Sequence, residues 1–157
     1  MSTRVADVVG LLARLVLGGV FLVAGALKVT TPEAMAKATQ AYQVLPHDLA
    51  AYVGYALPTI EIILGLLLLL GLFTRVAAAL TSLLLVAFIV GIAQAWARGL
   101  SIDCGCFGGG GTVAADETNY LQRLLEDVGL LACGLWLTLR PGARLSLDRA
   151  MFRPATT

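Results

Sequence analysis

The chain has 157 residues and a formal net charge of +1, and 59% of its residues are hydrophobic while 13% are charged. Soluble domains have roughly 45–50% apolar and about 25% charged residues, and a chain this small lacks the interior to bury such an excess. The composition therefore excludes a soluble domain and predicts an integral membrane protein. With so little net charge and no basic run interleaved with aromatic residues, nothing suggests a nucleic-acid partner.

Four stretches are long and apolar enough for transmembrane helices, which need about 20 residues at a rise of about 1.5 Å per residue. The predicted spans are residues 5–27, 49–70, 76–97 and 119–139. The third is the clearest because it contains no charged residue. The fourth is the weakest, since charges near its start leave only Val128–Leu139 continuously apolar. We expect an all-α fold in which the whole chain is a single domain, a transmembrane four-helix bundle.

The basic residues predict that both termini are cytoplasmic. Arg4 precedes the first span, Arg75 lies between the second and third, and four arginines fall within the tail 140–157. Basic residues favour the cytoplasmic side, and an even number of spans places all of these there. Loops 28–48 and 98–118 then face outward. This organisation predicts a multi-pass protein of the bacterial plasma membrane.

The second outward loop contains two closely spaced cysteines, Cys104 and Cys106, followed by four glycines at 108–111. Oxidation of two cysteines one residue apart closes a small, strained ring, and strained disulfides are labile and oxidising. Oxidised thiols persist outside the cytoplasm, and a glycine run is typical of a flexible linker. We expect these two cysteines to be a catalytic pair that exchanges disulfides with an extracytoplasmic protein.

A metal site is the weaker interpretation of the same loop. His47 and Asp103 would have to complete the ligand set, because structural zinc usually needs four ligands and a C-x₂₋₄-C spacing. No resident metal is therefore expected, and His47 is interpreted as a solvated loop residue. The third cysteine, Cys133, lies in an apolar stretch and fits a small buried packing residue.

Two charged residues lie inside the predicted spans. Arg14 is nine residues after Val5 and Glu61 nine before Leu70, so each lies about 14 Å from the cytoplasmic end. An isolated ion in hydrocarbon costs at least ~2.5–3.5 kcal/mol, which predicts a contact between the two side chains. The pair could fix the register of the helices, or it could hold a quinone head group or relay a proton. Both roles remain open.

The fourth span begins with three charged residues. Arg123 and Asp127 are one turn apart and could pair along the helix surface, with Glu126 on a neighbouring face. This is either an interfacial polar turn, or Glu126 or Asp127 takes the proton when a cysteine becomes the reactive thiolate.

The sequence resembles the MauE/DoxX family of small four-helix membrane proteins over about residues 8–140. The first two matching segments are LARLVLGGVFLVAGALK at residues 12–28 and LPTIEIILG at 57–65. The third, DCGCFG at 103–108, points to the MauE-like branch. The resemblance implies a role in methylamine utilisation, where MauE is thought to help a disulfide-rich periplasmic dehydrogenase subunit mature alongside a thioredoxin-like protein. Related DoxX members are linked to thiol-oxidative stress complexes and to thiosulfate–quinone chemistry.

By position, the resemblance implies that Cys104 and Cys106 are the redox pair and that Arg14, Lys28 and Glu61 are the polar positions of the helical motifs. Four-helix proteins that generate disulfides, such as DsbB and vitamin K epoxide reductase, use two cysteine pairs. This chain has one pair and a distant third cysteine, so a complete internal relay is not expected.

The first hypothesis is a membrane thiol–disulfide oxidoreductase that exchanges with a thioredoxin-like or client protein. A quinone near Arg14 and Glu61 is its candidate cofactor. The alternative is a non-catalytic membrane scaffold that anchors a soluble redox enzyme, and a small transporter ranks last. Membrane lipid is the expected surrounding, and a homo-oligomer is left open.

Overall fold

The computed structural model describes residues 3–103, 111–112 and 119–140. Cys104, Cys106 and residues 141–157 of the arginine-rich tail lie outside these residues. The described elements are the helices α1 (Thr3–Val29), α2 (Pro32–Ala41), α3 (His47–Leu70), α4 (Thr74–Ala97) and α5 (Tyr120–Leu139), and the strands β1 (Ile102–Asp103) and β2 (Gly111–Thr112).

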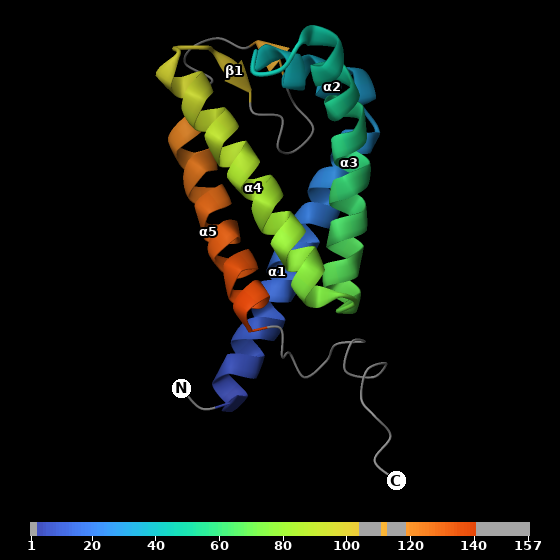
Figure 1. The fold of residues 1–157 in the computed structure, drawn as a ribbon, viewed down its shortest axis with the longest axis vertical. Coiled ribbons are helices and arrows are strands. Elements are labelled where there is room, and N and C mark those ends of the chain that lie inside the picture. The colour runs from blue at the N-terminus through green and yellow to red at the C-terminus, as the bar shows by residue number, and fades with distance from the viewer. Residues whose placement is uncertain (1–2, 104–110, 113–118, 141–157) are drawn as a thin grey trace.

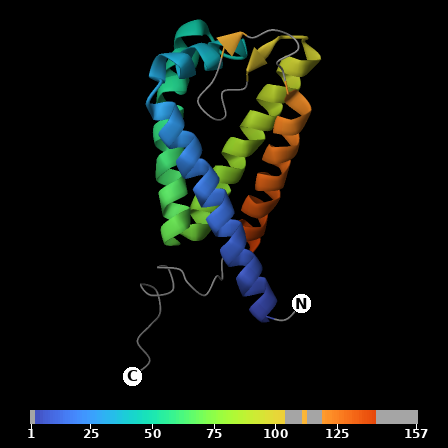
Figure 2. The ribbon, with the colours of Figure 1, turned by 180° about the vertical axis from the view of Figure 1, so that it is seen from behind.

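Four long helices run along the molecule, and α2 lies with the β1–β2 hairpin at one end of it (Figures 1 and 2). The start of α1 and the end of α5 lie together at the opposite end. The predicted all-α class is confirmed, with the two-residue strands as a small addition. The buried core lies between α1, α3, α4 and α5, where Leu17, Leu68, Leu85 and Leu137 pack.

Three of the described helices are long and apolar enough to cross a membrane: Val5–Val29, His47–Leu70 and Thr74–Ala97. Helix α5 occupies the position of the fourth predicted span but is not among the three. The membrane character of the protein follows from these three helices. A fourth crossing by α5 and the cytoplasmic location of both termini remain predictions.

The outward segment 28–48, interpreted above as a loop, contains the ten-residue helix α2. Pro32 occupies the start of this helix, where a missing N–H does no harm, and Glu33 lies favourably in its first turn. Ten residues span only about 15 Å, too short to cross a bilayer. The helix instead packs on α3 at Gly54, where a Cβ would come within 2.6 Å of the Met35 carbonyl oxygen.

Helices α1 and α3 pack closely because glycines line their interface. A Cβ added at Gly65 would lie 2.7 Å from the backbone nitrogen of Leu22 and 2.9 Å from the carbonyl oxygen of Gly18. One added at Gly25 would lie 2.8 Å from the carbonyl oxygen of Pro58. Small residues of this kind let membrane helices approach backbone to backbone. These contacts fix which residues of the two helices lie opposite each other.

Helix α3 ends at a tight turn into α4. Gly71 has φ 67°, a left-handed conformation that costs a glycine little, and the Leu72 N–H donates to the Leu67 carbonyl at 2.9 Å. From this turn the two helices diverge toward the end that carries α2 (Figures 1 and 2). The divergence opens a gap between α3 and α4 below α2, and this gap positions the site described next.

Candidate functional site

A buried ion pair joins α1 to α3. The Lys28 Nζ in the last turn of α1 donates a hydrogen bond of 2.6 Å to Oε1 of Glu61, in the body of α3. Lys28 is 5% exposed and Glu61 1%. The Lys28 ammonium also lies 5.5 Å from the centre of the Phe88 ring on α4, a cation–π distance. The pair is therefore enclosed by three helices.

The predicted contact between Arg14 and Glu61 is wrong, because Lys28 is the ionic partner of Glu61. The close packing at Gly25 sets Glu61 opposite the last turn of α1. Arg14 lies 14 residues before Lys28, about 21 Å away along the helix. The prediction assumed that the ends of α1 and α3 lie at the same level, but α1 projects beyond the end of α3 (Figures 1 and 2). Arg14 is itself buried, at another level of the bundle.

A second carboxylate, Asp127 of α5, belongs to the same cluster. Asp127 is buried and is attracted electrostatically by Lys28 and repelled by Glu126. With Lys28 and Glu61 it lines a cavity of about 30 Å³, a volume that a water molecule fits. Within the described part of the chain, Oδ2 of Asp127 and Oε2 of Glu61 are buried without a hydrogen-bond partner. The cluster thus holds one cation, two carboxylates and two acceptor atoms still available.

The ionic partner of Arg123 is Glu126 and not Asp127, the pairing that the helix spacing also allowed. Arg123 Nη1 lies 2.9 Å from Oε2 of Glu126, and both of these side chains are on the accessible side of α5. Successive residues of a helix point about 100° apart, so Glu126 can face outward while Asp127 faces the bundle. Of these three charged residues Asp127 is the buried one, and Glu126 reaches the small cavity only from its accessible side.

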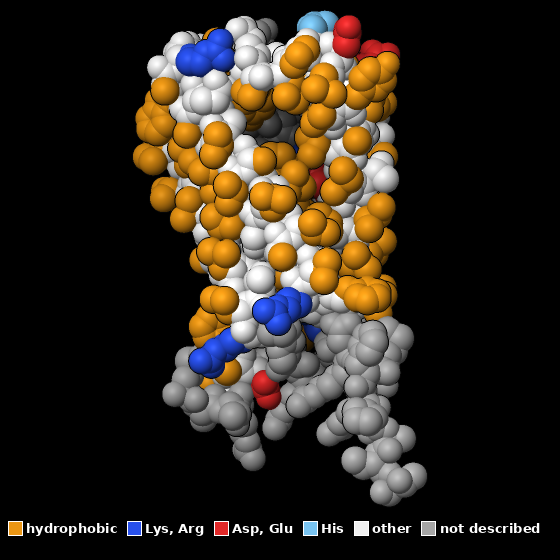
Figure 3. All heavy atoms as spheres, in the orientation of Figure 1, with side chains coloured by type: hydrophobic (Ala, Val, Ile, Leu, Met, Phe, Trp, Pro, Cys, Tyr) orange, Lys and Arg blue, Asp and Glu red, His pale blue; other side chains and the backbone are white. Residues whose placement is uncertain are grey.

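A larger cavity of about 400 Å³ lies beside the ion pair, in the gap between α3 and α4 and beneath α2. Figure 3 shows the face of the molecule hollowed there, between the upper part of α4 and the corner formed by α2 and α3. Its wall is mostly apolar and includes Lys28, Met35, Tyr42, Leu57, Phe88 and Gln94. At its outer end, Gln94 Nε2 donates to the Tyr42 carbonyl at 2.9 Å. No local sequence pattern indicates this cavity, since it depends on two helices diverging in space.

The predicted redox pair lies outside the described residues, but the residues on both sides of it are placed. Asp103, directly before Cys104, belongs to β1 and pairs with Gly111 of β2. The Tyr120 hydroxyl, at the start of α5, accepts a 3.1 Å hydrogen bond from the Ile102 N–H and donates to the Leu100 carbonyl. Tyr120 therefore ties the strand that leads into the cysteines to the bundle.

Sequence reasoning missed this role of Tyr120, although an aromatic hydroxyl at the start of a predicted span was a usable signal. The third cysteine, Cys133, lies on α5 and packs against the core as a free thiol. That position fits the packing role expected for it.

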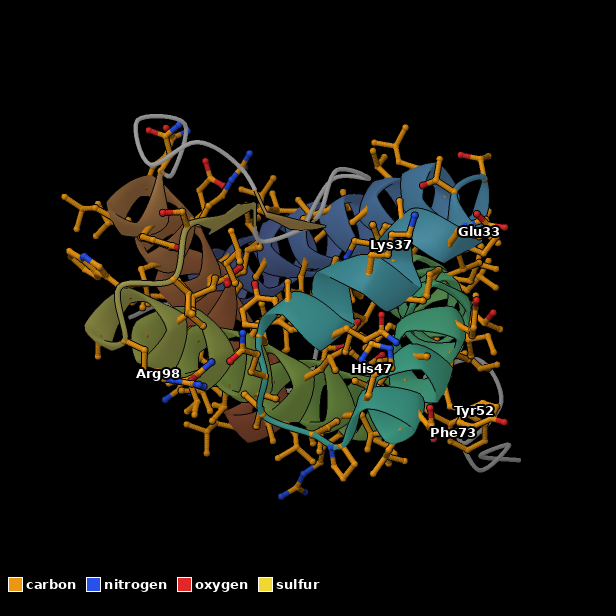
Figure 4. All side chains as sticks on the ribbon, turned by 90° about the horizontal axis from the view of Figure 1, so that it is seen from above. Glu33, Lys37, His47, Tyr52, Phe73 and Arg98 are labelled. Atoms are coloured by element: carbon orange, nitrogen blue, oxygen red, sulfur yellow. The ribbon has the colours of Figure 1, made fainter. Side chains whose placement is uncertain are left out.

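His47 is exposed at the end of the bundle that carries α2. It is the first residue of α3, and its Nε2 lies 3.0 Å from Nε2 of Gln40 on α2. Figure 4 shows His47 beside α2, with Arg98 across the same end. In the described ranges, no three His, Cys, Asp or Glu side chains gather as metal ligands would. His47 thus joins α2 to α3 rather than lying in a loop.

A family model described as "Methylamine utilisation protein MauE" matches residues 6–140. The chain belongs to the MauE family. The match covers the three membrane-type helices, the buried ion pair and the Cys-Gly-Cys segment, and it bears out the MauE part of the resemblance noted above. Comparison with curated proteins gave no match, and neither did comparison with solved structures.

Proposed function

We propose that this MauE-family membrane protein is a thiol–disulfide redox protein that supports oxidative maturation of extracytoplasmic proteins, with a methylamine dehydrogenase subunit as its candidate client. The observation that carries the proposal is the family match over residues 6–140, which includes the Cys-Gly-Cys segment. The hairpin supports it, since β1 and β2 hold the two ends of residues 104–110 at one end of the bundle.

The proposed exchange starts with Cys104 and Cys106 joined in a disulfide. A client thiolate attacks one sulfur of that bond, and the displaced cysteine leaves as a thiolate. A second client thiolate then resolves the mixed disulfide, so the client gains a disulfide and the pair accepts two electrons and two protons. The pair is reoxidised by the disulfide of a thioredoxin-like partner, which is reduced to its dithiol, or by a quinone, which is reduced to the quinol.

The direction of the loop follows from the predicted topology. With both termini cytoplasmic, the end that carries α2 and the hairpin faces outward, where disulfides persist. The protein is then a multi-pass protein of the bacterial plasma membrane. The buried charges at Lys28, Glu61 and Asp127 support a second function inside the lipid, because ionisable residues at membrane depth mark functional sites by default.

Serine substitutions test the exchange directly. Cys104→Ser and Cys106→Ser should each abolish oxidation of a client dithiol, and one of them should accumulate a mixed disulfide with the partner on non-reducing gels. Cys133→Ser is the matched control and should retain full activity, since that thiol packs in α5. Alkylation of intact cells with a membrane-impermeant maleimide, after reduction, should label the pair from outside. Wild-type client maturation in the Cys104→Ser/Cys106→Ser variant would instead establish the scaffold function.

A further inference from the structure

We infer that the cavity between α2, α3 and α4 is a binding site for a neutral, lipid-soluble carbonyl compound of the quinone type, whose carbonyl oxygen accepts a hydrogen bond from Lys28. The inference deepens the proposed function and rests on it for the redox role of the ligand. The binding itself is argued from the shape, polarity and charge of the cavity.

The cavity has the size and lining of a ligand site. Its volume of about 400 Å³ lies within the range of about 300–1,000 Å³ typical of small-molecule pockets. Leu45, Val44 and Val90 belong to its wall and are also exposed at the surface, so the mouth lies on the apolar side of the molecule. A ligand dissolved in the bilayer can therefore enter laterally between the diverging helices, without passing through water.

Lys28 gives the cavity a hydrogen-bond donor at its inner wall. An ammonium has three N–H donors, and among the described residues Glu61 accepts one of them at 2.6 Å. The Phe88 ring lines the cavity beside it and offers an aromatic face against which a planar head group can pack. A carbonyl oxygen near Lys28 and a ring against Phe88 would use both features.

The charge of the cluster selects a neutral head group. The Lys28 ammonium is bonded to Glu61 and also attracts Asp127, so a carboxylate or phosphate ligand would add negative charge beside two buried carboxyl groups in a low-dielectric environment. A neutral carbonyl adds none.

The depth of the ion pair in the membrane also favours a neutral, lipid-soluble ligand. Glu61 is nine residues from Leu70 and 14 from His47, about 14 and 21 Å from the ends of α3. Phospholipid head groups remain at the interface, so a compound that is wholly soluble in hydrocarbon fits this depth better.

The test uses the full-length protein in phosphatidylcholine nanodiscs, with decylubiquinone as the probe and native mass spectrometry as the readout of bound ligand. Wild-type protein should bind the probe saturably, and decylbenzene, which has a similar tail but no carbonyl, should bind at least tenfold more weakly. The Cys104→Ser/Cys106→Ser variant should bind the quinone as wild type does. Failure of thiol exchange would then be distinguishable from failure of this site.

Two variants locate the ligand. Gly91→Leu should fill the cavity and weaken binding at least tenfold, since a Cβ there meets only the Tyr42 ring at 3.5 Å and the helix can accept it. Gly129→Leu is the matched control on α5, where a Cβ meets nothing within 4 Å, and it should leave binding unchanged. The Lys28→Met/Glu61→Met variant should weaken binding about tenfold to a hundredfold, the value of a charge-assisted hydrogen bond. Equal binding by Gly91→Leu and Gly129→Leu, or by quinone and decylbenzene, would overturn the inference.

Discussion

Removal of the Lys28 ammonium should destabilise the protein more than any other single change at the ion pair. In Lys28→Met the apolar stem is kept and the charge is lost, so the carboxylate of Glu61 remains buried without its 2.6 Å partner. Asp127 also loses the cation that attracts it. Two like charges would then remain inside the bundle with no compensating cation from this pair.

Two independent values give the magnitude. Loss of one partner of a buried ion pair costs about 3–5 kcal/mol, and an isolated charge at mid-membrane costs at least ~2.5–3.5 kcal/mol on insertion scales. Lys28→Met should therefore lower the free energy of unfolding by about 3 kcal/mol or more. Glu61→Met should cost less, because Asp127 remains to attract the Lys28 ammonium. The double variant Lys28→Met/Glu61→Met should be less destabilised than Lys28→Met alone, since replacement of a whole buried pair by apolar residues is often neutral.

The assay is a double-mutant cycle of unfolding free energies, measured by titrating sodium dodecyl sulfate into mixed micelles and following circular dichroism. Leu27→Met, on the exposed side of the same turn of α1, controls for the methionine itself and should change stability little. The sum of the stability losses in the two single variants should exceed the loss in the double variant by about 2 kcal/mol or more, since coupled buried neighbours show interaction energies of about 0.5–3 kcal/mol. Simple additivity of the two single variants would refute it.

Two further predictions concern packing and the hairpin. Gly65→Ala should destabilise the bundle by at least ~1–3 kcal/mol because its Cβ would overlap backbone atoms of α1, whereas Gly129→Ala, with open space around it, should be neutral or stabilise α5 by up to about 1 kcal/mol in the same titration. Tyr120→Phe removes the hydroxyl bound by the Ile102 N–H and the Leu100 carbonyl. It should therefore speed amide hydrogen exchange of residues 100–103 and slow client oxidation, while exchange within α3 remains at its wild-type rate.

Hydropathy predicted the all-α class and the three clearest spans because α1, α3 and α4 are nearly free of charge over more than 20 residues each. The short helix α2 was not predicted, since its ten residues PEAMAKATQA are too few and too weakly hydrophobic to stand out as a span. Its position depends on Gly54, which lets the backbone of α2 approach α3. That approach is a tertiary contact between segments that a local sequence pattern does not relate.

The sequence also identified Glu61 as a buried charge that needs a partner but assigned it the wrong one. Lys28 lies at the last turn of a predicted span, where a lysine usually extends its ammonium to the interface. The helix α2 covers that end of the bundle, and the lysine turns inward instead. In the sequence, Asp127 is one of three charged residues close together at the start of α5. The sequence does not show which of the three is buried, because that depends on how α5 is oriented in the bundle.

The arrangement of the site follows from two helix–helix interfaces, here called seams: a closely packed one between α1 and α3 and an open one between α3 and α4. Between α1 and α3, glycines bring the backbones together, and this close approach holds Lys28 against Glu61 at a fixed register. Between α3 and α4 no such closure occurs beyond the turn at Gly71, and the helices diverge around the cavity. The charged pair is therefore rigid on one side and adjoins an open apolar space on the other. A purely structural lock would require only the first seam, so the second seam is the feature that favours a ligand.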